Sequence, residues 1–154
     1  MEFLRADITR KEHIISFLNE FSSAFPVPLT EKVSIEQYVN KVLEKGYVII
    51  AVENEGIAGV NMFYANDREK KRACISLICV SDKYRRRKVA TSLLQIAEDI
   101  SLENGMNYLL LCVHKENLGA IRTYEKFGFI RNDSLTANEE YNITYEKKIS
   151  GDLL

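Results

Sequence analysis

The apolar positions in the first third of the chain follow the spacing of two amphipathic helices. Across residues 14–25 they recur every three or four positions, behind a capping-box pattern that starts at Thr9. A second helix is predicted to begin after Ser34 as its cap and to end near Gly46. Between the two, an apolar loop with two prolines at residues 25–29 breaks the helical pattern.

Runs rich in apolar and β-branched residues predict the strands of a sheet. They lie at residues 3–7, 47–53, 57–65, 72–80, 108–113, 129–131 and 141–149. The segment Asn54-Glu55-Gly56 predicts a hairpin turn between the second and third of these strands. The run at 108–113 is apolar throughout, which predicts a strand covered on both faces.

Two further helices are predicted among the later strands. One runs from about Arg87 to Glu103 with a single apolar stripe and ends at Asn104-Gly105. The other begins after Asn117 as its cap and ends at Gly128. The element order therefore predicts a single α/β (α+β) domain over residues 1–154. Its mixed, mostly antiparallel sheet has about seven strands, flanked by about four helices.

Composition narrows the class of protein. The chain has 154 residues, a formal net charge of -1 and 46% hydrophobic residues, so a general surface for nucleic acid is not expected. No apolar run approaches the ~20 residues of a membrane-spanning helix, and the N-terminus lacks a secretory pattern. The three cysteines lie in apolar runs, without metal-ligand spacing. We expect them to be reduced and buried, in a cytoplasmic protein that binds no metal.

A dense cationic turn, Arg85 to Lys88, stands between the strand at 72–80 and the long helix. Backbone N–H groups converge at a helix start, the helix dipole adds partial positive charge, and arginines supply counter-charge. Because the rest of the chain is balanced in charge, this turn favours a small phosphorylated ligand over a long phosphate backbone.

The turn and a later segment together resemble the GCN5-related N-acetyltransferase (GNAT) family. The family carries Arg/Gln-x-x-Gly-x-Gly/Ala after a strand, and here residues 85–90 read Arg-Arg-Arg-Lys-Val-Ala. The family's later Asn…Tyr…Gly-Phe segment corresponds to Asn117, Tyr124 and Gly128-Phe129. The resemblance is specific from Ile75 to Phe129, and the order of elements extends it to the whole chain.

This resemblance implies an N-acetyltransferase that moves an acetyl group from acetyl-CoA to a primary amine of a small molecule or peptide. Transfer would occur by direct attack in a ternary complex, with the thioester between two splayed strands, 72–80 and 108–113. By correspondence with the family, the residues that bind the cofactor would be Ile78, Cys79, Val80, Arg85, Arg86, Arg87, Lys88, Val89, Ala90, Thr91 and Asn117.

Two catalytic roles follow from the resemblance and from the chemistry. Tyr124 matches the family's general acid, and a phenol of pKa ~10 can protonate a departing thiolate. An amine must also lose its proton before attack. Some relatives that acetylate protein N-termini carry a glutamate at the position of Cys112, so this chain lacks that base. His114, two residues along the same strand face, is a candidate base, with Glu116 or a water chain as alternatives.

Two departures from the family pattern support a second hypothesis. Lys88 occupies the position of a family glycine. A left-handed backbone there would cost roughly 1 kcal/mol or more, but we expect a helical backbone, so that the substitution costs little. With Cys112 in place of the glutamate, the alternative function is a catalytically silent acyl-CoA-binding or interaction module. Neither hypothesis includes nucleic acid or a membrane as a partner. Pairing of the last strand, 141–149, across a homodimer is compatible with both.

Overall fold

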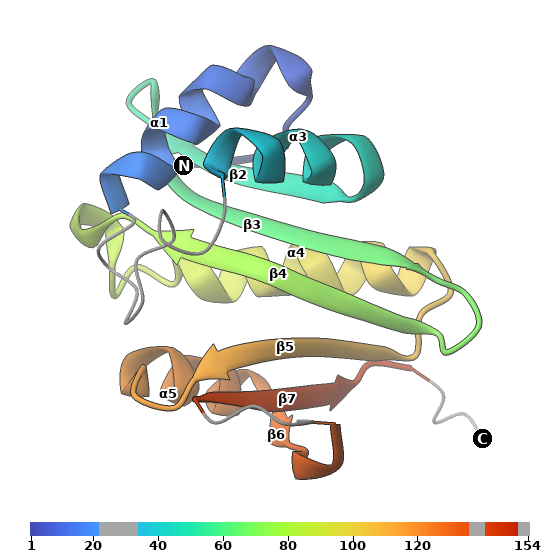
Figure 1. Cartoon of the computed structure of the whole chain (residues 1–154). Coiled ribbons are helices and arrows are strands. Elements are labelled where there is room, and N and C mark those ends of the chain that lie inside the picture. The colour runs from blue at the N-terminus through green and yellow to red at the C-terminus, as the bar shows by residue number, and fades with distance from the viewer. Residues whose placement is uncertain (22–33, 136–140, 151–154) are drawn as a thin grey trace.

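The backbone forms one mixed sheet of seven strands in the order β1-β2-β3-β4-β5-β7-β6. The computed structural model describes residues 1–21, 34–135 and 141–150 (Figure 1). The strands are β1 (Glu2–Arg5), β2 (Tyr47–Glu53), β3 (Gly56–Asp67), β4 (Arg72–Val80), β5 (Tyr108–His114), β6 (Ile130–Arg131) and β7 (Asn142–Lys148). All neighbours run antiparallel except β4 and β5.

Four α-helices flank the sheet in the described part of the chain. They are α1 (Lys11–Phe21), α3 (Ile35–Lys45), α4 (Val89–Glu103) and α5 (Leu118–Phe127), with short 3-10 turns η1 (Ile8–Arg10), η3 (Asp82–Tyr84) and η4 (Asp133–Leu135). Helix α4 is the crossover that joins the parallel strands β4 and β5. This architecture confirms the predicted fold class.

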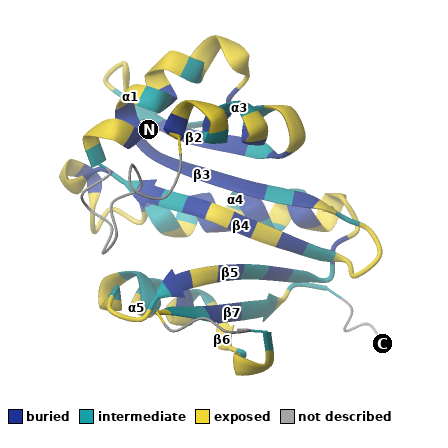
Figure 2. Cartoon of the chain, in the orientation of Figure 1, coloured by how far each residue is buried: buried dark blue, intermediate teal, exposed yellow. Residues whose placement is uncertain are grey.

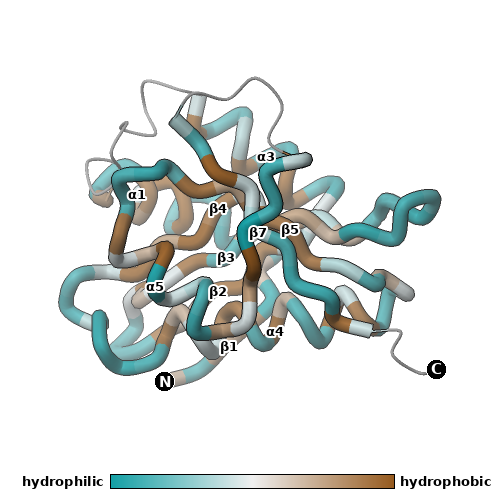
Figure 3. The backbone as a smooth tube through the Cα atoms, turned by 90° about the horizontal axis from the view of Figure 1, so that it is seen from below, coloured by the Kyte–Doolittle hydropathy of each residue, from teal (hydrophilic) through white to brown (hydrophobic). Residues whose placement is uncertain are grey.

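The sheet separates two apolar layers (Figure 3). On one face, Ile14 of α1 and Val39 of α3 pack with β2, β3 and β4. On the other, Leu93 and Ala97 of α4 pack with β5 residues such as Leu109. The amphipathic stripes predicted for these helices are therefore their buried faces, as the burial colouring shows (Figure 2).

Strand β5 is covered on one face, which corrects the prediction that both faces would be buried. Leu109, Leu111 and Val113 are buried, whereas Cys112 between them is exposed. The reason is that the apolar layer of α1 and α3, in the described residues, includes β2, β3 and β4 but nothing from β5 (Figure 1).

Local signals placed the start of α3 correctly but not the start of α1. Ser34 caps α3 by accepting the Gln37 N–H, as predicted. The capping box at Thr9 is wrong, because Asp7 accepts the Thr9 N–H at 3.0 Å and begins η1 instead. The predicted loop at 25–29 lies outside the described residues.

The predicted β2–β3 hairpin is confirmed, and its two turn residues have left-handed backbone. Asn54 and Glu55 form a two-residue loop with φ of 54° and 64°. Positive φ at both central residues is the geometry that matches the twist of paired strands. The last strand, proposed for pairing across a homodimer, is β7, and it pairs with β5 on one side and β6 on the other.

Gly59 of β3 lies directly under the first turns of α4. A Cβ atom there would stand 3.2 Å from Val89 Cγ1, 3.3 Å from Leu93 Cδ1 and 3.2 Å from the Cys79 carbonyl oxygen. We predict that Gly59→Ala lowers the free energy of unfolding in urea by about 1–3 kcal/mol, because the helix must move outward. Gly56→Ala, whose Cβ would meet its nearest atom at 3.8 Å, is the matched control. Equal losses in both variants would contradict this contact.

Candidate active site

Strands β4 and β5 pair over only four residues before they separate. The paired residues are Arg72 to Ile75 on β4 and Tyr108 to Leu111 on β5. Beyond them β4 continues to Val80 and β5 to His114, with no pairing between the two strands in the described sheet (Figure 1). We call these unpaired ends, residues 76–80 and 112–114, the splay. Family resemblance predicted the splay, and the strand register shows it.

A β-bulge at Ser76 coincides with the start of the splay. Met62 of β3 pairs with Leu77, but the next residue, Phe63, pairs with Ile75, so Ser76 is extra. A bulge bends its strand and increases the local twist, which turns the end of β4 away from β5. The bulge also exchanges the two faces of β4, since Ile75 packs in the α4 layer whereas Leu77 packs in the α1–α3 layer.

Helix α3 contacts the bulge through Tyr38, and the sequence did not predict this contact. The Tyr38 hydroxyl and Ser76 Oγ are 2.5 Å apart. Burial raises the pKa of Tyr38 to about 12, so the phenol remains protonated in this contact. The sequence feature that could have indicated this contact is the polar Ser76 within an apolar run.

The cationic turn contains two non-glycine residues in left-handed backbone. Arg86 has φ 63° and Lys88 has φ 61° with ψ 23°, while Arg87 between them keeps a negative φ. The expectation of helical backbone at Lys88 is therefore wrong: Lys88 is the N-cap of α4, which begins at Val89 rather than near Arg87. Left-handed backbone costs a residue with a Cβ atom roughly 1–2 kcal/mol.

The same turn presents unused backbone donors. The first bond of α4 runs from the Ser92 N–H to the Lys88 carbonyl at 3.0 Å. Within the described residues, the N–H groups of Val89, Ala90 and Thr91 donate to no acceptor, and Lys88 gives no side-chain cap. Alternating backbone handedness directs successive N–H groups into an anion-binding concavity, to which the helix dipole adds partial positive charge. This arrangement suits a phosphate group.

Two of the four cationic side chains in the turn already have carboxylate partners. Arg85 Nη2 lies 2.9 Å from Asp82 Oδ1. Arg87 donates from both Nη atoms to Glu53, at 3.1 and 3.3 Å. The turn therefore offers its backbone donors together with the side chains of Arg86 and Lys88. Sequence reasoning missed Glu53, which lies 34 residues away at the end of β2.

Tyr124 of α5 is buried near the end of β4. Its ring packs edge-on against Phe129, with the centroids 6.0 Å apart. Burial raises the pKa of the Tyr124 phenol well above its ordinary value, and the neighbouring Cys79 adds to the shift. Burial likewise raises the pKa of the Cys79 thiol to about 11. Both predicted site residues are thus buried and held in their neutral forms.

His114 ends β5, and its ring and one ring nitrogen contact neighbouring residues. Nδ1 accepts the Glu116 N–H at 3.1 Å, so the neutral ring carries its hydrogen on Nε2. Glu116 Oε2 lies 3.9 Å from the same Nδ1, and the ring stacks on Tyr141 at 6.0 Å. Asn117 caps α5 through its Oδ1, which accepts the Ala120 N–H at 3.4 Å, and its NH₂ group is the part that can bind a ligand.

The cysteines differ from the expectation that all three would be buried. Cys79 is buried, but Cys74 and Cys112 are exposed. Both lie on the face of β4 and β5 that α1 and α3 leave uncovered. The described residues contain no group of three or more His, Cys, Asp or Glu placed to hold a metal ion.

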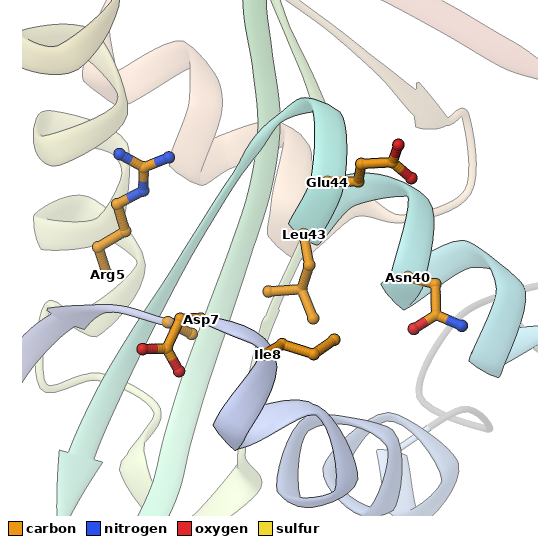
Figure 4. Close-up of a pocket in the computed structure, with 7 residues that line it drawn as sticks. Arg5, Asp7, Ile8, Asn40, Leu43 and Glu44 are labelled. Carbon is orange, nitrogen blue, oxygen red and sulfur yellow. The ribbon is translucent and has the colours of Figure 1, made fainter.

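A hollow of about 750 Å³ lies away from the splay, between the β1–η1 segment and α3 (Figure 4). Its lining residues are Arg5, Ala6, Asp7, Ile8, Asn40, Leu43 and Glu44. None of these is a predicted site residue, so the candidate active site rests on the splay and the turn. Among the described helices, none has the length and apolar character needed to cross a membrane.

Residues 14–129, which include the splay, the turn and Tyr124, match the sequence model of the acetyltransferase (GNAT) family. The chain belongs to the GNAT family. The resemblance drawn from the turn and the Asn117–Phe129 segment is thereby confirmed.

Individual GNAT relatives agree with this assignment. Over 112 residues, or 70% of this chain, it is 30% identical to the Arabidopsis thaliana N-terminal acetyltransferase B complex catalytic subunit NAA20, of whose length it spans 58%. A GNAT acetyltransferase from Staphylococcus aureus has the same fold, with a TM-score of 0.81 at 17% identity and 97% and 99% coverage of the two chains. The Escherichia coli ribosomal-protein-S18-alanine N-acetyltransferase gives 0.77 at 20% identity, with 99% and 97% coverage.

The raised pKa of Tyr124 in this GNAT protein predicts an optical result. Because burial disfavours the charged phenolate, Tyr124 stays protonated at pH values, about 10, where an exposed tyrosine is half ionised. The phenolate absorbance of the folded wild type and of Tyr124→Phe should therefore coincide up to that pH. One additional phenolate in the wild type below about pH 10 would contradict the burial argument.

Proposed function

We propose that this GNAT protein transfers an acetyl group from acetyl-CoA to a primary amine of a small molecule or peptide by direct attack in a ternary complex. The observation that carries the proposal is the splay, which opens beside a turn of unused N–H donors and a buried phenol. A cytoplasmic location is part of the proposal, because three unpaired cysteines suit a reducing compartment.

The residues in the turn and the splay fit coenzyme A. The N–H groups of Val89, Ala90 and Thr91, with the left-handed turn before them, would hold the pyrophosphate. Within the described sheet, the edge of β4 at 78–80 has no strand partner on its β5 side, so its backbone groups would be available to the amides of the pantetheine arm. Asn117 would contribute its NH₂ group from the start of α5.

The catalytic acid would be Tyr124. Acetyl-CoA supplies a thioester whose C–S bond breaks as the amine nitrogen bonds to the acyl carbon, leaving a thiolate. The Tyr124 hydroxyl, held protonated by burial, would donate its hydrogen toward that sulfur. Its burial in the apolar layer against which Ile78 and Val80 of β4 pack supports this role, since the thioester would lie between the two splayed strands.

The base that removes the amine proton would be His114. Its Nδ1 would exchange the hydrogen bond from the Glu116 N–H for a proton from the acceptor, directly or through water. The Glu116 carboxylate, 3.9 Å away, would then offset the charge of the imidazolium. Because Glu116 is itself an alternative base, both residues require a test.

A catalytically silent acyl-CoA-binding module is the second candidate. It draws on the strained non-glycine residue Lys88 and on Cys112 at the position where some relatives carry a glutamate. Thiol release from acetyl-CoA across a panel of small amines and short peptides separates the two functions. Amine-dependent release supports the acetyltransferase, whereas tight coenzyme A binding without release from any amine supports the module.

Tyr124→Phe should lower kcat by about 100-fold or more and leave KM for acetyl-CoA nearly unchanged. The substitution removes the proton donor but keeps the ring that packs on Phe129. Steady-state kinetics with the best amine of the panel measures both constants. Unchanged turnover in this variant would remove Tyr124 from the mechanism.

His114→Gln should lower kcat/KM about tenfold or more near neutral pH. Glutamine keeps an N–H donor at the end of the side chain but takes up no proton. The deficit should shrink as the pH rises through the pKa of the acceptor amine, because a free amine needs no base. Rate profiles of both proteins against pH test this. If Glu116→Gln shows the pattern and His114→Gln does not, Glu116 is the base.

A further inference from the structure

We propose that Glu53 is a positioning residue that keeps the cationic turn in its left-handed form, and so keeps the N–H groups of the turn ready for the cofactor. The inference rests on the proposed coenzyme A function of the turn. Glu53 is the last residue of β2, and β3 lies between β2 and β4 in the sheet. It would act on the turn through Arg87.

The contacts fix Arg87 from two directions. Both oxygens of Glu53 accept from both terminal nitrogens of Arg87, at 3.1 and 3.3 Å; the Glu53 side chain is 22% exposed and the Arg87 side chain 50%. A bidentate pair of this kind fixes the plane and direction of the guanidinium as well as its position. The guanidinium also lies over the ring of Tyr84, 5.1 Å from its centroid, and Tyr84 is buried.

Arg87 is the residue between the two strained positions. Arg86 and Lys88 flank it with φ of 63° and 61°. Residues with a Cβ atom leave this region readily when nothing restrains them, because right-handed backbone is less strained. Such a change would rotate the peptide planes of the turn and redirect their N–H groups. With the arginine attached to β2 and η3, both flanking residues are restrained, and a glycine is not needed at Lys88.

If only the charge of Glu53 mattered, its removal would have the opposite effect on coenzyme A binding. The Glu53 carboxylate is a negative group close to a proposed anion site, and it occupies a guanidinium that would otherwise attract phosphate. If Glu53 acted only through its charge, its removal would strengthen coenzyme A binding. If it acts through the conformation of the turn, its removal weakens binding. The two explanations therefore differ in sign.

Glu53→Gln removes the charge and the bidentate geometry while keeping the size of the side chain. We expect the dissociation constant for coenzyme A, measured by calorimetry, to rise about fivefold to tenfold. KM for acetyl-CoA should rise with it, while kcat changes little. Glu55→Gln is the matched control: it makes the same charge change two residues away, in the exposed hairpin turn, and should bind as the wild type does.

The decisive variant carries Arg86→Gly and Lys88→Gly in the Glu53→Gln background, because both strained positions must be relieved. Glycine adopts positive φ without strain, so this triple variant should bind coenzyme A within about twofold of Arg86→Gly/Lys88→Gly alone. A structural defect elsewhere, including loss of the 3.6 Å contact between Glu53 and the N-terminal ammonium, would not be rescued in this way.

Three results overturn the inference. Glu53→Gln binding equal to or tighter than the wild type contradicts it, and so does failure of the glycine rescue; in both cases the proposed function stands if the wild type binds coenzyme A. Absence of coenzyme A binding by the wild type itself overturns the proposed function, and this inference with it.

Discussion

The separation of β4 from β5 after four residue pairs is the constraint on which the candidate site depends. The bulge at Ser76 turns the end of β4 aside, which leaves its 76–80 edge unpaired. Because β4 and β5 are parallel, the chain must cross over through α4 before it returns. The start of α4, and with it the cationic turn, therefore lies at the end of β4 where the pairing has stopped. Tyr124, on the next helix along the chain, is buried in the apolar layer against which Ile78 and Val80 also pack.

The turn shows that a run of basic residues is a poor guide to what binds an anion. Four cations in a row drew attention to residues 85–88, yet two of them are engaged with Asp82 and Glu53. The features best suited to phosphate are backbone features: left-handed residues, unused N–H groups and the helix dipole. In the proposed function, the arginines contribute in part by holding the backbone that would bind the phosphate.

The sequence predicts those parts of the fold that depend on interactions between neighbouring residues. The bounds of β2 and β4, the caps at Ser34 and Asn117, and the hairpin at Asn54 depend on neighbouring residues, and the structure confirms them. The failures depend on distant contacts. Left-handed backbone at Lys88 accompanies a pair between Arg87 and Glu53, 34 residues apart. The exposed face of β5 follows from where α1 and α3 pack, which no pattern within residues 108–113 records.

The uncovered face of the sheet affects how coenzyme A release can be assayed. Cys74 and Cys112 are exposed there, while Cys79 is buried with its pKa raised to about 11. A colorimetric reagent that detects free coenzyme A by its thiol will also label the protein at the exposed Cys112. Burial raises the pKa of the Cys74 thiol as well as that of Cys79, so both of these react more slowly. The protein therefore contributes its own background signal, in proportion to its concentration. Protection of either exposed cysteine from the reagent by a bound acceptor would map where that acceptor lies.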